Sequence, residues 1–445
     1  MSRQRTIIRS SCAWSVCLVI CGALRATAQA PASPMVMTLG QALARGRSNG
    51  VQTALSRLAA EGVRIRRQEQ GAALLPQIEA SGTVQRQTLN LHEFGLSIPG
   101  FPAVTDPFTL FRARVSASQV LFDHALIERL RAARDTAIAA GLDAERAGDL
   151  TAATAGAAWL RLASAQETVT AREQDSVTAF ALLDIARSQV DAGTAPRIDR
   201  TRSETRAAAV RVEIAVARNE RDRAGIDLAR ATDLPLGVSL VIPGDAAISA
   251  DTLPTDIAAA VALAQAHRVD LAAERAREVA IEGTLGAIRS EFIPSIAASG
   301  FVQTSGTGVD SLAGTWNIGV GLSWSIFDGF RRQRRVDEQQ LRLDAERHRL
   351  HDIEMQIEAD VREAALDVAS AREQMSLASD RVRLATEELS EARERFAAGV
   401  TGSVETTNAQ SELASARNAL IQARLSAGAA QINAARALGL LDRVR

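Results

Sequence analysis

The side chains best suited to chemistry are few in this chain of 445 residues, and they form no familiar catalytic pattern. His348 and His351 lie three positions apart on an expected helix and could share a metal ion, but the sequence offers no obvious third ligand. The chain has no phosphate-binding loop, no HExxH motif and no nucleophile elbow. We therefore expect no enzymatic activity, no cofactor and no metal site.

The three cysteines all lie near the N-terminus, in a segment typical of a secretory signal. Three arginines precede an apolar run over residues 12–24 that is too short for a stable membrane anchor, and an Ala-Thr-Ala cleavage motif follows at 26–28. We expect residues 1–28 to be a signal peptide, which leaves the mature chain without a thiol. Attachment of a lipid to Cys21 is the alternative use of this segment.

Composition excludes one class of partner. The formal net charge is −1, so the chain lacks the basic surface that nucleic-acid binding requires. Aromatic residues make up only 3% of the chain, which argues against several compact globular cores. After the N-terminal segment no apolar run reaches the length of a transmembrane helix, so entry into a membrane would have to occur as strands.

A long helical seam dominates the second half of the chain. From Leu350 to Phe396 the apolar residues recur every three or four positions, a period of about 3.5 that is typical of a coiled coil. Many are alanines, which allow close helix packing. Long helices are expected over 123–193 and 328–399, each about 70 residues and on the order of 100 Å if unbroken. Each ends at a glycine turn, and a shorter helix returns.

The chain repeats itself with a shift of about 206 to 218 residues. The repeated segments, in the same order in both halves, are LPQIEASGTVQ and IPSIAASGFVQ, VSASQVLFD and VGLSWSIFD, LRLASAQE and LDVASARE, VDAGTAPRID and FAAGVTGSVE, and LARATDL and AARALGL. The stretches 39–74 and 257–292 also correspond, and we expect each to be one helix. The sequence therefore predicts a first repeat over 29–235, a linker over 236–253 and a second repeat over 254–445.

Each repeat contains two segments with strand-like alternation of apolar and polar residues. In three of these four segments the apolar positions are Ile78, Ala80, Gly82 and Val84, then Phe111, Ala113, Val115 and Ala117, and, in the second repeat, Trp316, Ile318, Val320, Leu322, Trp324 and Ile326. At roughly 9–11 residues these strands could cross a bilayer, with apolar side chains toward lipid and polar ones toward a lumen. A half-buried sheet of a soluble protein is the alternative.

Aromatic and basic residues flank these strands. Phe122, Trp316, Trp324 and Phe327 lie near strand ends, where membrane barrels carry an aromatic girdle. A group of arginines over 331–335 follows the last strand and either contacts the membrane rim or is a solvated helix start. Four strands cannot close a transmembrane barrel, and an open edge is not stable in lipid. The chain is therefore expected to form a homotrimer with twelve strands.

The order strand, loop, strand and long hairpin occurs twice in the chain, which also contains the segments IPSIAASG, SIFDG and AAGVTGSVETTNAQSEL. In these features the chain resembles the TolC family of outer membrane efflux proteins. The resemblance covers essentially the whole mature chain. It implies a mixed α+β membrane protein in which four transmembrane strands per chain contribute to a trimeric twelve-stranded β-barrel, continuous with a periplasmic α-helical coiled-coil barrel. The expected location is the outer membrane of a Gram-negative bacterium, in contact with its lipid.

The same resemblance implies a function, partners and site residues. The protein would be the passive exit duct of a tripartite efflux or type I secretion system, joined to a periplasmic adaptor and an inner-membrane RND or ABC pump. The tip residues Gly193, Thr194, Gly399 and Val400 would contact the adaptor. The aperture candidates are Asp199, Arg202, Glu405 and Asn408.

Two alternatives remain open at this point. Asp199 and Glu405 fall in the first turn of a helix, where negative charge is favourable without any role in an aperture. The whole chain could also be a soluble periplasmic coiled-coil adaptor or scaffold without a pore, although that function leaves the two pairs of alternating strands unexplained.

Overall fold

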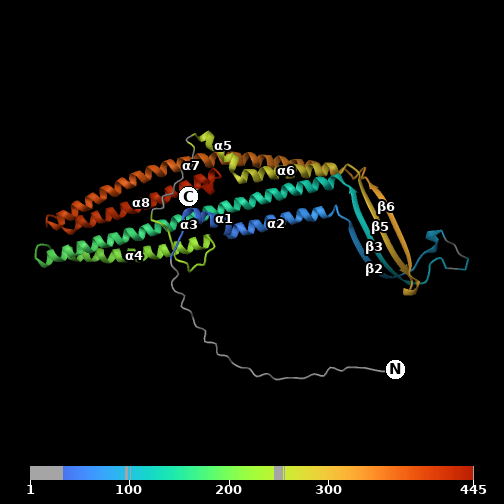
Figure 1. Ribbon diagram of the computed structural model, residues 1–445, viewed down its shortest axis with the longest axis horizontal. Helices are drawn as coiled ribbons and strands as arrows, with labels where there is room; N and C mark the ends of the chain where they lie inside the picture. The colour runs from blue at the N-terminus through green and yellow to red at the C-terminus, as the bar shows by residue number, and fades with distance from the viewer. Residues whose placement is uncertain (1–33, 96–98, 101, 245–253, 255, 444–445) are drawn as a thin grey trace, which may run out of the picture.

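The molecule is elongated, with a β-sheet at one end and two helical hairpins that reach the other (Figure 1). The computed structural model describes residues 34–95, 99–100, 102–244, 254 and 256–443. The expected signal peptide, residues 1–28, lies outside the described residues. The C-terminus lies near the middle of the body, where the shorter helices end beside the long ones.

Two unbroken helices run most of the length of the body: α3 (His124–Asp191) and α7 (Arg331–Ala397). Each turns back at its tip into a shorter helix, α4 (Arg197–Ala231) and α8 (Ser403–Ala437) respectively. The start of α3 is fixed by Asp123, whose carboxylate accepts a hydrogen bond from the backbone N–H of Leu126. The long hairpins predicted from the seam are therefore present.

The seam of α7 is buried over most of its length. Ile357, Val361 and Ala364 pack with the C-terminal part of α8 and with α5, and a second buried group around Leu389 packs with α8 near the tip. Between these groups the seam opens, because Met375 is 39% exposed. Small alanines account for much of the buried surface and permit the close approach of the helices.

The expectation of one continuous helix over 39–74, and another over 257–292, is wrong. Each stretch is two helices, α1 (Leu39–Asn49) with α2 (Val51–Ala72), and α5 (Ile257–His267) with α6 (Val269–Ser290). The breaks are at Gly50 and Arg268, where ψ is 136° and 119°, so the chain is extended there. The two breaks occupy matching positions in the repeat.

The physical reason for the first break is the contact with α3. A Cβ on Gly50 would lie 2.9 Å from Cβ of Thr151, and one on Gly46 would lie 2.6 Å from Cβ of Ala155. The glycines let α1 approach α3 closely, and the chain must then bend to let α2 follow the same long helix. Apolar periodicity alone does not reveal such a bend, because the period continues across it.

The main sheet has four antiparallel strands in the order β2 (Gln77–Gln87), β3 (Phe108–Phe122), β5 (Ser295–Gly306) and β6 (Ala313–Ser323). The strands leave the helical body at an angle (Figure 1). Trp324 and Ile326 were expected to continue β6 but lie beyond its end. The indole N–H of Trp324 donates to the carbonyl oxygen of Phe292 instead, which fixes the chain at the turn toward α7.

A second, small sheet joins the two ends of the first repeat. The strand β1 (Met35–Val36) pairs in parallel with β4 (Leu240–Val241), which lies inside the predicted linker. Beside this pair, the indole N–H of the buried Trp159 donates to the carbonyl oxygen of Met37. The last part of the linker, residues 245–253, lies outside the described residues.

Short 3₁₀ helices occur in the connections and at the C-terminus. They are η1 (Leu91–Phe94), η2 (Val309–Ser311) and η3 (Leu441–Arg443). Within the described ranges, no helix has both the length and the apolar character needed to cross a membrane.

Candidate aperture, sheet surface and helix joint

The two hairpin tips share the same backbone turn. Gly193 and Gly399 have φ of 74° and 71°, in the left-handed region that glycine adopts without steric cost. The backbone N–H of Thr194 returns to the carbonyl of Gln189, and that of Val400 returns to the carbonyl of Arg395. These bonds satisfy carbonyls at the helix ends. All four adaptor-contact candidates are exposed, so this surface is available to a partner.

Asp199, the first aperture candidate, is buried between the two hairpins. Its side chain is 5% exposed, and one carboxylate oxygen accepts hydrogen bonds from the hydroxyl of Ser403 at 2.5 Å and from the backbone N–H of Ser403 at 3.3 Å. Ser403 is the first residue of α8. A carboxylate from α4 therefore caps the N-terminus of α8, where the free N–H groups and the helix dipole favour negative charge.

Glu405 occupies the matching position in the second repeat, and its surroundings are different. Its carboxylate lies 2.8 Å from the guanidinium of Arg395, across its own hairpin, and the side chain is 38% exposed. Arg202 is 3.8 Å from Asp199 and half-exposed, and Asn408 is exposed. The structure thus pairs Asp199 with Arg202 on α4 and pairs Glu405 with Arg395 across the second hairpin.

Two further contacts between the tips were not identified from the sequence. The side-chain amide of Gln189 donates to the carbonyl oxygen of Phe396 at 2.7 Å. Phe396 is 1% exposed and packs against Leu182 and Ala186 of α3. The partners are about 200 residues apart in the chain, so local patterns contain no signal for them. Together with the Asp199–Ser403 contact, they hold the second hairpin's tip against the first.

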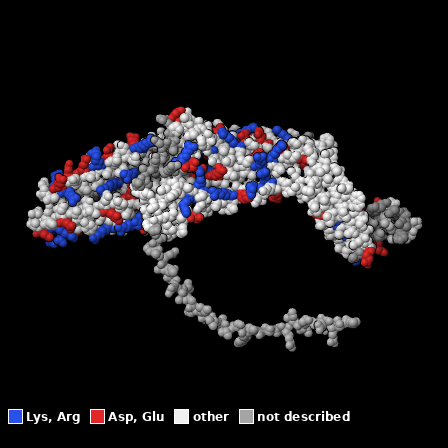
Figure 2. Space-filling model, viewed as in Figure 1, with Lys and Arg blue, Asp and Glu red and all other residues white. Residues whose placement is uncertain are grey.

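One face of the main sheet is an exposed apolar surface. On β6 alone, Trp316, Ile318 and Val320 are 75%, 77% and 69% exposed. Ile78 and Val302 continue this surface on other strands, at 74% and 65%. Figure 2 shows the sheet as an almost uncharged surface, whereas the helices carry interspersed positive and negative residues. An apolar patch of this extent indicates contact with lipid or another protein.

The girdle candidates divide between the two ends of this surface. Trp316 lies toward the loop between β5 and β6, whereas Phe122, Trp324 and Phe327 lie at the end that meets the helices. All four side chains are exposed, from 41% for Phe122 to 75% for Trp316. This arrangement leaves aromatic residues at both limits of the apolar face.

The arginines after β6 do not all form a solvated helix start. Arg332 is only 5% exposed; its guanidinium pairs with Asp328 at 2.9 Å and donates to the carbonyl oxygens of Glu291 and Ser325. It also lies over the ring of Phe292 at 4.5 Å. Arg332 therefore fastens the start of α7 to the end of α6, directly below the sheet.

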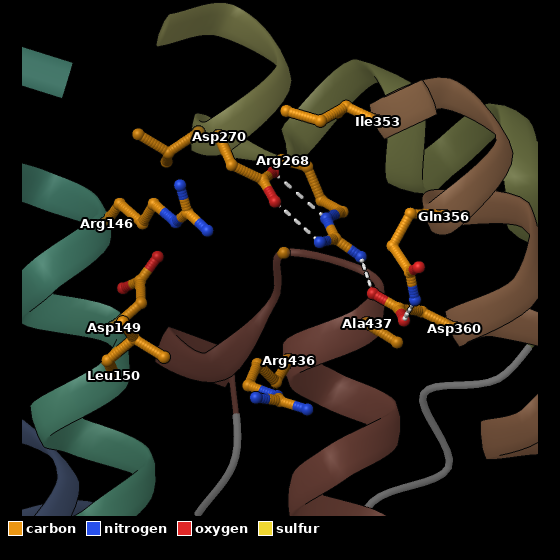
Figure 3. A pocket seen from close by; sticks show the side chains of 12 residues that line it. Arg146, Asp149, Leu150, Arg268, Asp270, Ile353, Gln356, Asp360, Arg436 and Ala437 are labelled. Atoms are coloured by element: carbon orange, nitrogen blue, oxygen red, sulfur yellow. Dashed lines mark hydrogen bonds and ion pairs between the residues drawn. The ribbon is translucent and has the colours of Figure 1, made fainter. Parts of the chain in front are cut away.

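A hollow of about 320 Å³ lies at the break between α5 and α6. Figure 3 shows the guanidinium of Arg268 directed between Asp270 and Asp360, with Arg146 and Arg436 on other sides of the hollow. The ion pairs of Arg268 measure 2.6 Å to Asp270 and 2.5 Å to Asp360. Because Arg268 pairs with Asp270 of α6 and with Asp360 of α7, this cluster joins the break between α5 and α6 to the long helix.

The pKa of Asp270 is lowered at this joint. Burial on its own would raise the pKa, but the hydrogen bonds and charge of Arg268 outweigh burial, and the backbone N–H of Leu271 contributes in the same direction. The pKa of Arg268 is raised for the reciprocal reason: burial opposes the charge, and Asp270 and Asp360 stabilise it. Both groups therefore remain ionised across the physiological pH range.

Comparisons with known proteins point to one family. The outer membrane efflux protein family matches residues 260–440. No curated protein matches the sequence. Among solved structures, CusC is similar with a TM-score of 0.76 and 18% identity, over 90% of this chain and 92% of that chain.

Two further structures are similar to the same extent. The open state of the Neisseria gonorrhoeae MtrE outer membrane channel has a TM-score of 0.75 and 21% identity, over 91% of this chain and 89% of that chain. VceC, an outer membrane protein of Vibrio cholerae, has a TM-score of 0.74 and 15% identity, over 90% and 96%. These identities establish a common fold. Residues 260–440 match the outer membrane efflux protein family, and the described residues share the fold of CusC, MtrE and VceC.

Proposed function

We propose that this protein is the outer-membrane exit duct of a tripartite efflux or type I secretion system. The observation that carries the proposal is a four-stranded sheet with an exposed apolar face and two unpaired edges, joined directly to long helical hairpins. In lipid, an apolar outer face is stable, but open strand edges are not. The sheet is therefore one part of a larger closed barrel.

Strand direction supports closure by three copies. Neighbouring strands are antiparallel throughout, so the edge strands β2 and β6 run in opposite directions. The β6 edge of one protomer can then pair with the β2 edge of the next in the same antiparallel sense. Three protomers give twelve strands, an even number that falls within the range of outer-membrane barrels.

Exposed apolar residues on the helices support the same assembly. On α7, Leu366, Leu377 and Leu384 are 71%, 63% and 55% exposed, at spacings of eleven and seven that keep them on one side of the helix. On the opposite side of the body, α2 exposes Leu58 at 69% and α4 exposes Val212 at 65%. Figure 1 shows α7 along one side and α2 and α4 along the other. Head-to-tail contact between these two sides would close a helical tunnel.

The duct is passive in this proposal. Its helices would lie in the periplasm, α3 extending on the order of 100 Å at 1.5 Å per residue. Energy would come from an inner-membrane RND or ABC pump through a periplasmic adaptor that contacts the tips at Gly193, Thr194, Gly399 and Val400. The aperture would involve the partly exposed Glu405 and the exposed Asn408, with Asp199 joining the two hairpins and Arg202 beside it on α4.

The alternative, a soluble periplasmic adaptor or scaffold, conflicts with the sheet. Such a protein would have no reason to expose Trp316, Ile318 and Val320 on one continuous face. Its two edge strands would also remain open to aggregation.

Two adjacent residues of β6 provide a matched test. Ile318 is on the apolar face and Asn317 on the polar face. We expect Ile318→Arg to abolish the heat-modifiable trimer in outer-membrane fractions, because arginine on a lipid face costs about 2–4 kcal/mol near the bilayer centre. Asn317→Arg should assemble normally. Release of the wild-type protein by osmotic shock, with equal tolerance of both changes, would contradict a membrane barrel and favour the adaptor.

A further inference from the structure

The polar face of the main sheet carries an uncompensated pair of arginines. Arg112 and Arg114 are on β3, two residues apart, so their side chains leave the same face. Arg112 pairs in register with Thr83 and Ser305, and Arg114 pairs with Ser81 and Gln303. Every strand neighbour of either arginine on this face is therefore uncharged.

The arginines lie midway along the strands. Their partners on β2, Thr83 and Ser81, fall at the centre of the range Gln77–Gln87. If the strands span the bilayer, both guanidinium groups lie near its midplane. There the low dielectric constant of the surrounding lipid focuses the field of a charge into the lumen.

Arg114 is held against the wall by an aromatic ring. Its guanidinium carbon is 3.8 Å from the centroid of Phe301 on β5. A cation–π contact of this kind orients the guanidinium without neutralising it. Among the described residues, Nε of Arg112 and Nε of Arg114 are shielded from solvent and have no hydrogen-bond partner.

One acidic residue shares this face. Glu79 is on β2, one row nearer the helices, and lines the same hollow of about 380 Å³ as Arg114 and Phe301. Within the described chain no ion pair of 4.0 Å or less joins Glu79 to Arg114. The four strands, all described, thus place two positive charges and one negative charge on the polar face of each protomer.

We infer that Arg112 and Arg114 form a cationic ring inside the barrel that favours anionic solutes, such as those bearing carboxylate, sulfate or phosphate groups. This inference rests on the proposed function, because only a closed barrel gathers the arginines of three protomers around one lumen. Rings of arginine are a recurrent device for anion preference in pores. The cationic ring selects by charge and has no defined pocket for one ligand.

The test measures the chloride-to-potassium permeability ratio of the full-length protein in a planar bilayer across a potassium chloride gradient. The Arg112→Gln/Arg114→Gln variant should lower this ratio about tenfold at low salt, the lower end of the enrichment that a focused field produces. The loss should shrink at high salt, where screening weakens the field. Arg112→Lys/Arg114→Lys retains the charge and should retain the ratio.

Two controls use charges on the same strand pair. Arg86 is on the opposite face of β2, so Arg86→Gln should leave the permeability ratio unchanged. Glu79→Gln removes the negative charge from the polar face and should raise the ratio.

The outcomes separate the inference from the function beneath it. A wild-type protein that forms no trimer and no pore would overturn the proposed duct. A conducting trimer whose permeability ratio is the same with and without Arg112 and Arg114 would overturn the cationic ring alone.

Discussion

The two hairpin tips have the same turn and occupy matching places in the repeat, but they use their side chains differently. In the first hairpin, Gln189 and Asp199 both reach outward and bind the second hairpin, at Phe396 and Ser403. Their counterparts in the second hairpin, Arg395 and Glu405, bind each other.

This difference teaches that the polar link between the two tips is one-sided, whereas farther from the tips Arg417 and Arg424 of α8 pair with Asp175 and Glu167 of α3. The polar contacts that join one tip to the other come from first-hairpin side chains that reach the backbone or hydroxyl of the second. The second hairpin contributes the apolar anchor, the buried ring of Phe396. A duplicated sequence has thus produced two tips with complementary rather than identical roles.

The largest expected effect is at the apolar anchor. Phe396→Ala should lower the free energy of local unfolding at the tips by roughly 3–5 kcal/mol, because it leaves a cavity where a ring is now enclosed. Its counterpart Val190 is half-buried, and Val190→Ala should cost less than about 1 kcal/mol. Hydrogen exchange of the tip amides measures both. Equal losses at the two positions would mean that the tips are energetically symmetric.

The second-largest difference between the tips is expected for the two matching carboxylates, Asp199 and Glu405, whose loss should lower tip stability by different amounts. Asp199→Ala leaves the first N–H of α8 and the hydroxyl of Ser403 without their acceptor, so we expect a loss of about 1–3 kcal/mol in tip stability. Glu405→Ala breaks a partly exposed ion pair and should cost no more than about 0.5 kcal/mol. Asp199→Asn keeps an acceptor oxygen and should fall between them. The same hydrogen-exchange measurement would refute the comparison if Glu405→Ala proved the more damaging change.

Conductance tests the aperture role separately from stability. If Glu405 contributes to an aperture ring, Glu405→Ala should change the conductance of the reconstituted channel and its sensitivity to polyvalent cations. Asp199→Ala should act by loosening the tip, with conductance that fluctuates more between levels. Conductance and cation sensitivity that match the wild type in both variants would eliminate the aperture role.

A smaller difference in tip stability is expected between the third matching pair of residues, Gln189 and Arg395. Gln189→Ala removes a hydrogen bond to the carbonyl of Phe396 and should cost about 1 kcal/mol. Arg395→Ala removes the partner of Glu405 on an exposed surface and should cost about 0.5 kcal/mol or less. Protease cleavage at the tips gives an independent reading: a faster rate for Arg395→Ala than for Gln189→Ala would argue against a one-sided link.

The contribution of Asp270, at the helix joint, to the stability of the folded protein should change only at acidic pH. The pKa of Asp270 is lower in the folded protein, so its stabilising effect is complete above the ordinary aspartate value of about 3.9 and is lost as the pH falls through the lower folded value. Between neutral pH and pH 5 we expect no change from this group. Below pH 4, the wild type should lose stability more steeply than Asp270→Asn in thermal melts; parallel slopes would contradict the assignment.

The sequence was sufficient to predict the long hairpins and the glycine turns because these follow local rules. Apolar residues at a coiled-coil period predict α7 from Leu350 onward, and the glycines predict the left-handed turns. The alternation of β6 predicts its two faces. The predicted end of β6 was wrong, because the alternation continues past the strand to Trp324 and Ile326. Two more alternating residues do not distinguish a strand from a turn.

The contacts at the tips and the joint could not be predicted in the same way. Nothing near Asp199 in the sequence indicates that it binds Ser403, because that contact depends on how two hairpins pack. The break at Arg268 is equally hidden, since its ion pair with Asp360 joins residues 92 positions apart. Repeat symmetry also misleads here, because it suggests one role for Asp199 and Glu405.

The unpaired edges of the sheet have a consequence for biogenesis. A newly delivered protomer exposes the bare edges of β2 and β6, and each can template the other on a second copy. In the proposed trimer, folding of the sheet is a second-order or higher process. It is faster when more copies arrive in the same place and is vulnerable to incorrect strand pairing when copies are few. Its thermal stability should depend on how many chains share the membrane, which is a property of the population and not of one molecule.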